Sequence, residues 1–159
     1  MLRKILASVL LLATLFSLSS CGSEEFSHAE LIITLPSGFS SVESDSYDLV
    51  MREGDVSVSV LRVSLYVAAQ QGIPDNLSPR AFAEYIFEAR GLEGAVYDYK
   101  DIPYFTEYAE SAARKLYTLY TFYRSKNAYF IILFTAPRKD EAALRESFLE
   151  YADTVKFTD

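Results

Sequence analysis

The sequence predicts an α+β fold in which an antiparallel β-sheet is covered by helices, an α/β/α sandwich. Three observations support this prediction. Residues 116–123 and 129–134 alternate with apolar side chains on both faces, which is typical of central strands covered on both sides. Residues 78–90 have the apolar spacing of an amphipathic helix, and a second helical stripe follows Pro137. At 159 residues, the chain has the length of a single domain.

The first twenty residues are predicted to be a signal peptide and not part of the fold. Arg3 and Lys4 precede the apolar run ILASVLLLATLF, and small residues follow it, which is the order of a secretory signal. The run is shorter than the roughly 20 residues that a membrane-spanning helix needs.

The end of this segment, Leu18-Ser19-Ser20-Cys21, resembles the lipobox of bacterial lipoproteins, and Cys21 is the only cysteine in the chain. The resemblance implies cleavage after Ser20, with lipid on the Cys21 sulfur and on its new amino group. Two acyl chains suffice for stable anchoring, so the expected location is the extracytoplasmic side of the cell membrane. The alternative is an ordinary signal peptide with an incidental cysteine, which leaves an unpaired exported thiol to be explained.

The mature chain is expected to be strongly acidic. Removal of residues 1–20 leaves 13 cationic and 22 acidic side chains, a net charge of −9. This balance argues against nucleic acid as a partner and against flat docking on anionic lipid. Residues 21–28 are expected to be the lipidated cysteine and a polar tether, and residues 29–159 a single domain.

The domain is expected to open with a strand and a hairpin. Leu31, Ile33 and Leu35 recur at every second position before the Pro36-Ser37-Gly38 stop. Residues 47–66 follow as a hairpin turning at residues 53–55. Its return strand shifts its apolar alternation by one residue after Val60, which indicates either a bulge or a strand that passes from one covered face to the other.

A connector over residues 67–77 leads to the clearest helix. Ser78 is expected to cap it, Pro79 suits its first position, and Gly91 suits its end. The expected buried stripe consists of Phe82, Tyr85, Ile86 and Ala89.

The second half is expected to hold the centre of the sheet. Two short strands broken at residues 101–103 precede a hairpin that turns at the RSKN sequence, residues 124–127. A final helix covers the sheet with a stripe of Leu144, Phe148, Tyr151 and Val155.

The aromatic side chains of residues 115–137 are interpreted mainly as core. Tyr117 and Tyr123 share one face, which is expected to be the less covered one, and each buried hydroxyl needs a partner. With Tyr85 of the preceding helix, they are the candidate face for a ligand or a partner.

The order of elements resembles the PsbP-like family, named after an extrinsic photosystem II protein. The resemblance covers roughly residues 29–158 and depends on LIITLPSGFS at the domain start, the middle helix, and AYFIILFTAPRKDEAALRESFLEYADTVKF at the end. It implies an antiparallel sheet between helices and non-enzymatic roles that involve a partner. It carries over no functional residue, because the family pattern here contains no catalytic motif.

Chemistry-bearing residues are few. His28, the only histidine, is interpreted as a solvated tether residue, and no cofactor motif is present. A weak calcium site is the alternative to solvated charges for an acidic group near the hairpin, comprising Glu43, Asp45, Asp48, Glu53 and Asp55. A general acid/base pair is the alternative to surface charges for a second group, comprising Asp98, Asp101, Glu107 and Glu110.

Two functional hypotheses follow. The first is a lipid-anchored, non-catalytic accessory module of the cell envelope that acts through a protein partner. The second is a small-ligand-binding lipoprotein with a pocket between the sheet and a helix, near Tyr85, Tyr117 and Tyr123. An enzyme ranks third, because its only candidate groups are the carboxylates at residues 98–110.

Overall fold

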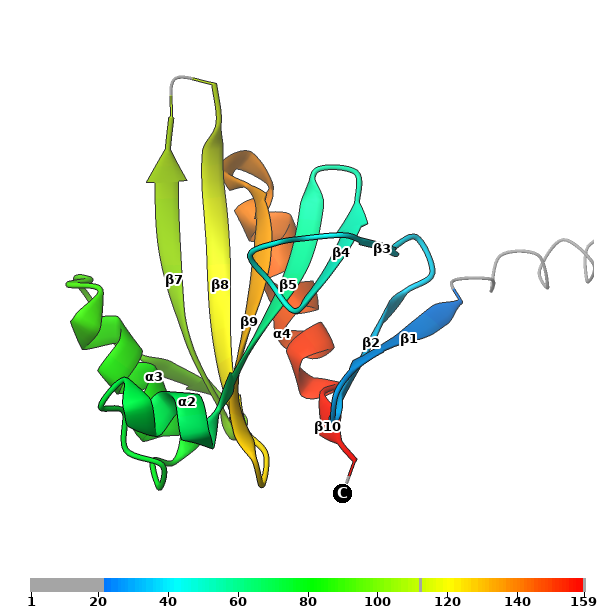
Figure 1. The fold of residues 1–159 in the computed structure, drawn as a ribbon. Coiled ribbons are helices and arrows are strands. Elements are labelled where there is room, and N and C mark those ends of the chain that lie inside the picture. The colour runs from blue at the N-terminus through cyan, green and yellow to red at the C-terminus, as the bar shows by residue number, and fades with distance from the viewer. Residues whose placement is uncertain (1–21, 112, 159) are drawn as a thin grey trace, which may run out of the picture.

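The computed structural model describes residues 22–111 and 113–158. Its main feature is a seven-stranded sheet in which every pair of neighbouring strands is antiparallel (Figure 1). In spatial order the strands are β3 (Ser40–Val42), β4 (Leu49–Glu53), β5 (Val56–Ser64), β9 (Ala128–Pro137), β8 (Lys115–Arg124), β7 (Ile102–Glu110) and β6 (Tyr97–Tyr99).

Helices cover both faces of this sheet, as the sequence predicts. One face carries α2 (Leu65–Gln70) and α3 (Pro79–Ala89), and the other carries α4 (Glu141–Asp153), which follows the short 3₁₀ helix η1 (Arg138–Asp140) (Figure 1). The α+β prediction is therefore confirmed. The short helix α2 begins at the last two residues of the predicted hairpin and continues into the expected connector, and Ser64 caps it through a hydrogen bond from the Val67 amide, 3.2 Å.

A second, three-stranded sheet packs beside α4. It consists of β1 (Ser23–His28), β2 (Leu31–Pro36) and β10 (Lys156–Phe157), in the order β1-β2-β10. The predicted tether is thus wrong for residues 23–28, since this segment pairs with β2 along its whole length. The reason is Phe26, which is buried with only 8% of its surface exposed, among otherwise exposed polar neighbours.

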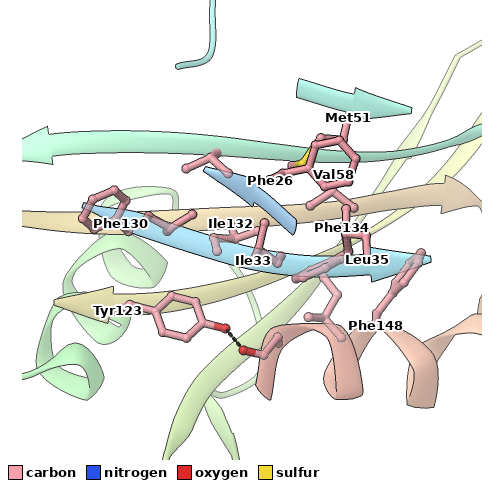
Figure 2. Close-up of a cluster of buried hydrophobic side chains, with 14 of the residues drawn as sticks. Phe26, Ile33, Leu35, Met51, Val58, Tyr123, Phe130, Ile132, Phe134 and Phe148 are labelled. Atoms are coloured by element: carbon pink, nitrogen blue, oxygen red, sulfur yellow. Dashed lines mark hydrogen bonds between the residues drawn. The ribbon is translucent and has the colours of Figure 1, made fainter. Parts of the chain in front are cut away.

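Two hydrophobic clusters lie on opposite faces of the large sheet. The cluster on the α4 face joins Leu31 and Ile33 of β2 to Phe130 and Ile132 of β9 and to Phe148 of α4 (Figure 2). The cluster on the α3 face is centred on four aromatic residues, Phe82, Phe105, Phe122 and Tyr129. The predicted two-sided burial of the central strands is confirmed, because alternate residues of β9 enter each cluster.

The shift of alternation in β5 is a change of covered face and not a bulge. The pairing of β5 with β9 runs without interruption from Ser57 opposite Thr135 to Ser64 opposite Ala128. Val58 and Val60 enter the cluster on the α4 face, whereas the later residues Leu61, Val63 and Leu65 pack against the cluster on the α3 face.

The caps of α3 agree with the prediction, but its buried stripe does not. Ser78 accepts a hydrogen bond from the Ala81 amide at 3.1 Å, and Gly91 ends the helix with a φ of 63°. The side chains that pack against the sheet are Phe82, Ala83, Ile86 and Phe87, so Tyr85 and Ala89 point away. Phe87 belongs to the buried stripe because its ring packs edge-on against the Phe105 ring, with the ring centroids 5.2 Å apart.

Among the described residues, no helix has the length and apolar character needed to cross a membrane.

Candidate functional site

The described residues form a cleft that is cationic. It has a volume of about 570 Å³, and its residues come from the β4–β5 turn, the approach to β8, the end of β9 and η1. Figure 1 shows these ends of the strands at the end of the sheet opposite α2. Arg114, Lys115, Arg138 and Lys139 line it, together with Asp55 and three uncharged residues, Ala113, Leu116 and Pro137. Four of the chain's fifteen cationic side chains therefore converge on one site of a protein with a net charge of −7.

The hairpin of β8 and β9 brings these cations together. Leu116 pairs directly with Pro137, so the residues just before β8 face the residues just after β9 across the end of the sheet. Leu116 and Pro137 line the cleft, and all four cationic side chains are exposed. Exposed cations with few neutralising partners attract anions from solution and hold them through charge-assisted hydrogen bonds.

Two of the four cations are held in place by neighbours. The Arg138 guanidinium lies 4.5 Å from the centre of the Tyr108 ring, whose hydroxyl donates to Glu141 Oε1 at 2.8 Å. This hydrogen bond, together with burial, raises the pKa of Tyr108. Lys115 Nζ lies 2.7 Å from Glu110 Oε1. Arg114 and Lys139 make no ion pair with the described residues, so their charge remains available to an anion.

The three predicted tyrosines do not form a common site. Tyr85 is 38% exposed on α3, whereas Tyr117 and Tyr123 are buried on the opposite face of the sheet, beneath α4. The prediction that this face is the less covered one is wrong, because α4 and the three-stranded sheet enclose it.

The two buried tyrosines differ in their hydrogen bonding. Tyr123 donates its hydroxyl to the Ala152 carbonyl at 2.8 Å, as Figure 2 shows. The Tyr117 hydroxyl is buried without a hydrogen-bond partner among the described residues, and its ring stacks on Phe148 with centroids 6.3 Å apart. Burial raises the pKa of both phenols, so both stay neutral throughout the physiological range.

The proposed calcium ligands are also separated. Asp48 and Asp55 lie at opposite ends of β4, which at ~3.3 Å per residue places them roughly 20 Å apart. Asp48 instead accepts the Arg62 amide at 2.7 Å and lies 3.8 Å from His28 Nε2. Asp45 is exposed in the preceding loop, and within residues 22–111 and 113–158 no three potential ligands are grouped for a metal. His28 belongs to β1 and not to a tether.

Three of the four candidate acid/base carboxylates are held in ion pairs. Asp98 pairs with Arg80, Glu107 lies 2.6 Å from Arg90 Nη2, and Glu110 pairs with Lys115 as described above. Asp98 stands opposite Pro103, so Glu107 lies four residues, about 13 Å, further along the edge. Asp101 is exposed in the turn between β6 and β7. Asp98 and Glu107 are therefore farther apart than the paired carboxylates of a glycosidase-type acid/base site.

The predicted lipobox, Leu18 to Cys21, lies outside the described residues. The described chain is already held at Gly22, whose carbonyl accepts the Ser37 amide at 2.9 Å.

The comparisons with known proteins support the fold. The solution structure of cyanobacterial PsbP (CyanoP) from Synechocystis matches with a TM-score of 0.55 and 14% identity, over 87% of this chain and 94% of that one. The fold is PsbP-like. A crystal structure from Bacteroides thetaiotaomicron also matches this PsbP-like chain, with a TM-score of 0.59 and 14% identity over 87% of it, and the match spans about half (49%) of that protein. No family model matches, and no curated protein is similar enough to be matched.

Proposed function

We propose that the protein is a lipid-anchored, non-catalytic accessory module of the cell envelope that binds a protein partner through its cationic cleft. The observation that carries this proposal is the concentration of Arg114, Lys115, Arg138 and Lys139 around one cleft of an acidic chain. A partner with acidic side chains meets attraction at this end of the domain and repulsion over most of the remaining surface. Such a pattern selects one orientation of approach as well as one kind of partner.

The non-catalytic part of the proposal is supported by the carboxylates. Glu107 and Asp98 bind arginine side chains, and the buried tyrosines are held neutral by their surroundings. Groups in these settings stabilise the fold and are poorly placed to exchange protons with a substrate.

The anchoring part is supported by the sequence at Cys21 and by the start of the fold. Because Gly22 is already bonded to Ser37, lipid on Cys21 would hold the domain directly against the membrane, without a free tether. We expect Cys21→Ala to move the full chain from the membrane fraction to the soluble fraction. A Cys21→Ala chain that stays with the membrane would contradict the anchor and leave the cleft proposal intact.

The cleft is tested by a charge-matched pair of double variants. Arg138→Gln with Lys139→Gln removes two cleft cations, and Lys126→Gln with Lys156→Gln removes two exposed cations elsewhere. The tagged full chain is expected to retain one stoichiometric envelope protein. The cleft variant should lose it by about tenfold, because each exposed charge contact contributes up to ~1 kcal/mol. Equal retention by both variants would overturn the proposal.

A small anion is the second candidate occupant, since the cleft volume of about 570 Å³ falls within the range of ligand pockets. Two results together favour the protein partner over the small anion. The cleft variant loses the partner, and phosphate or a dicarboxylate does not raise the melting temperature of the wild type.

A further inference from the structure

The strand β7 has a free outer edge. Its inner side pairs with β8 from Tyr104 to Glu110, but β6 pairs with it only from Ile102 to Tyr104. Within the described ranges no strand lies on the outer side of residues 105–110. Unpaired backbone groups at a sheet edge are a template on which another extended chain can add.

The outward-pointing groups can be identified from the two turns that flank β7. In an antiparallel pair, bonded and non-bonded positions alternate. The two-residue turn between Tyr99 and Ile102 makes these a bonded pair, so even-numbered residues of β7 point towards β6. At the other end the Ser111 amide donates to the Arg114 carbonyl at 2.8 Å, so odd-numbered residues point towards β8. The two turns give the same result: the amide and carbonyl groups of Thr106, Tyr108 and Glu110 point outward, away from β8.

A groove runs beside this edge. It has a volume of about 320 Å³ and separates Thr106 and Tyr108 from the loop that follows α3, at Leu92 and Gly94. Tyr97 also lines it, and the side chains of Tyr97 and Tyr108 are 53% and 47% exposed. Exposed tyrosines beside a groove offer contact area to a bound segment at a low cost in conformational entropy.

The edge leads directly into the cationic cleft. Glu110, at the end of β7, pairs with Lys115 of the cleft, and Arg138 of the cleft lies over the Tyr108 ring. Glu93 also lines the groove, and it makes no ion pair with the described residues. Binding along the edge should therefore be tightest for a segment that has acidic side chains at the cleft end and none near Glu93.

We propose that the free edge of β7 receives an extended segment of the partner protein as an added strand, with acidic side chains of that segment reaching the cationic cleft. This inference depends on the proposed function, because it takes the ligand to be a protein. A second copy of this chain is disfavoured, since pairing two β7 edges would bring Glu107 and Glu110 of two acidic chains together.

The test uses proline to remove one outward amide. Thr106→Pro deletes an N–H that has no partner in the free chain, and an edge strand tolerates proline at such a position. Glu25→Pro is the matched control, because the turn after His28 makes His28 and Leu31 a bonded pair and so places the Glu25 amide on the free edge of β1. Both variants should melt within a few degrees of the wild type.

Binding is read by photo-cross-linking in the cell that makes the protein. Benzoylphenylalanine replaces Tyr97 beside the groove, Ala113 in the cleft, or Tyr66 on α2, which is 73% exposed and lines neither the groove nor the cleft. We expect one protein adduct from the Tyr97 and Ala113 positions and none from Tyr66. Thr106→Pro should weaken the Tyr97 adduct by about fivefold, the effect of one lost hydrogen bond, and Glu25→Pro should not.

Each other outcome overturns the inference in a distinguishable way. An adduct from Ala113 alone leaves the proposed function standing and removes the added strand. An adduct with a second copy of the chain shows a different mode of binding. So does a Tyr97 adduct whose yield Thr106→Pro does not change. No adduct from either position removes the proposed function as well. If Thr106→Pro unfolds, amide hydrogen exchange of the wild type, with and without the partner, tests the added strand instead. An added strand must slow exchange of the Thr106 and Tyr108 amides at least tenfold and leave exchange of the Glu25 amide unchanged.

Discussion

Two tyrosines on one face of β8 show how differently similar side chains can contribute. Tyr117 and Tyr123 are both buried beneath α4, yet only the Tyr123 hydroxyl has a hydrogen-bond acceptor, the Ala152 carbonyl near the end of that helix. Tyr123 therefore ties the helix to the sheet by a polar contact as well as by packing. Tyr117 contributes through its ring alone.

Removing the two hydroxyls should have unequal effects. Tyr123→Phe removes the 2.8 Å hydrogen bond to the Ala152 carbonyl, which keeps only the Val155 amide at 3.3 Å, and should lower the free energy of unfolding by about 1 kcal/mol. Tyr117→Phe removes a buried hydroxyl that lacks a partner, so it should be neutral or slightly stabilising. Urea unfolding of both variants measures the difference, and equal losses would contradict this account of the core.

Glu30 links the two sheets through charge. Its carboxylate accepts hydrogen bonds from Arg62 Nε at 3.1 Å and from the Ser125 hydroxyl at 2.7 Å. Burial by itself disfavours the charged form, but the hydrogen bonds from Arg62 and Ser125 outweigh it and hold the pKa of Glu30 below its usual value. A lowered pKa in the folded state stabilises the fold above the usual value of 4.5 and ceases to do so as the pH falls through the lowered pKa.

The resulting pH dependence is testable. We expect Glu30→Gln to be less stable than the wild type at pH 7, and the difference to shrink below about pH 4.5. Urea midpoints of the two proteins between pH 7 and pH 3 measure it. Parallel pH profiles would show that the charge of Glu30 does not contribute.

At the scale of elements, the main departure from the sequence prediction is β1. The stretch SEEFSH carries one apolar residue, so no alternation distinguishes it from a polar linker, and its partner β2 decides its structure. The strand β10 has only two residues and is equally invisible to a periodic pattern. The strong alternation of β2, β5, β8 and β9 and the capped helix α3 were predictable, because burial on defined faces leaves a period in the sequence.

The contribution of β1 should be measurable at Phe26. Because its ring is 8% exposed in the cluster on the α4 face, Phe26→Ala should cost about 3 kcal/mol of unfolding free energy. Glu24→Ala, at an exposed position of the same strand, should change it by less than about 0.5 kcal/mol. A small effect of both substitutions would mean that the segment is dispensable, as a tether would be.

At the scale of the whole molecule, the candidate site was only partly accessible from the sequence. The strands 116–123 and 129–134 and their RSKN turn were predictable, and their register places Arg114 and Lys115 opposite Arg138 and Lys139. That register was the available signal. The tyrosine hypothesis failed because the position of α4 and the rotation of α3 depend on tertiary packing, which decides whether an aromatic face is covered.

If an acidic partner binds through the cationic cleft, a fluorescent hexaglutamate peptide should bind there too, and anisotropy at low salt measures its affinity. We expect saturable binding to the wild type and to Lys126→Gln/Lys156→Gln, and at least about tenfold weaker binding to Arg138→Gln/Lys139→Gln. Equal affinity for the two double variants, or binding of hexalysine in preference to hexaglutamate, would contradict this account.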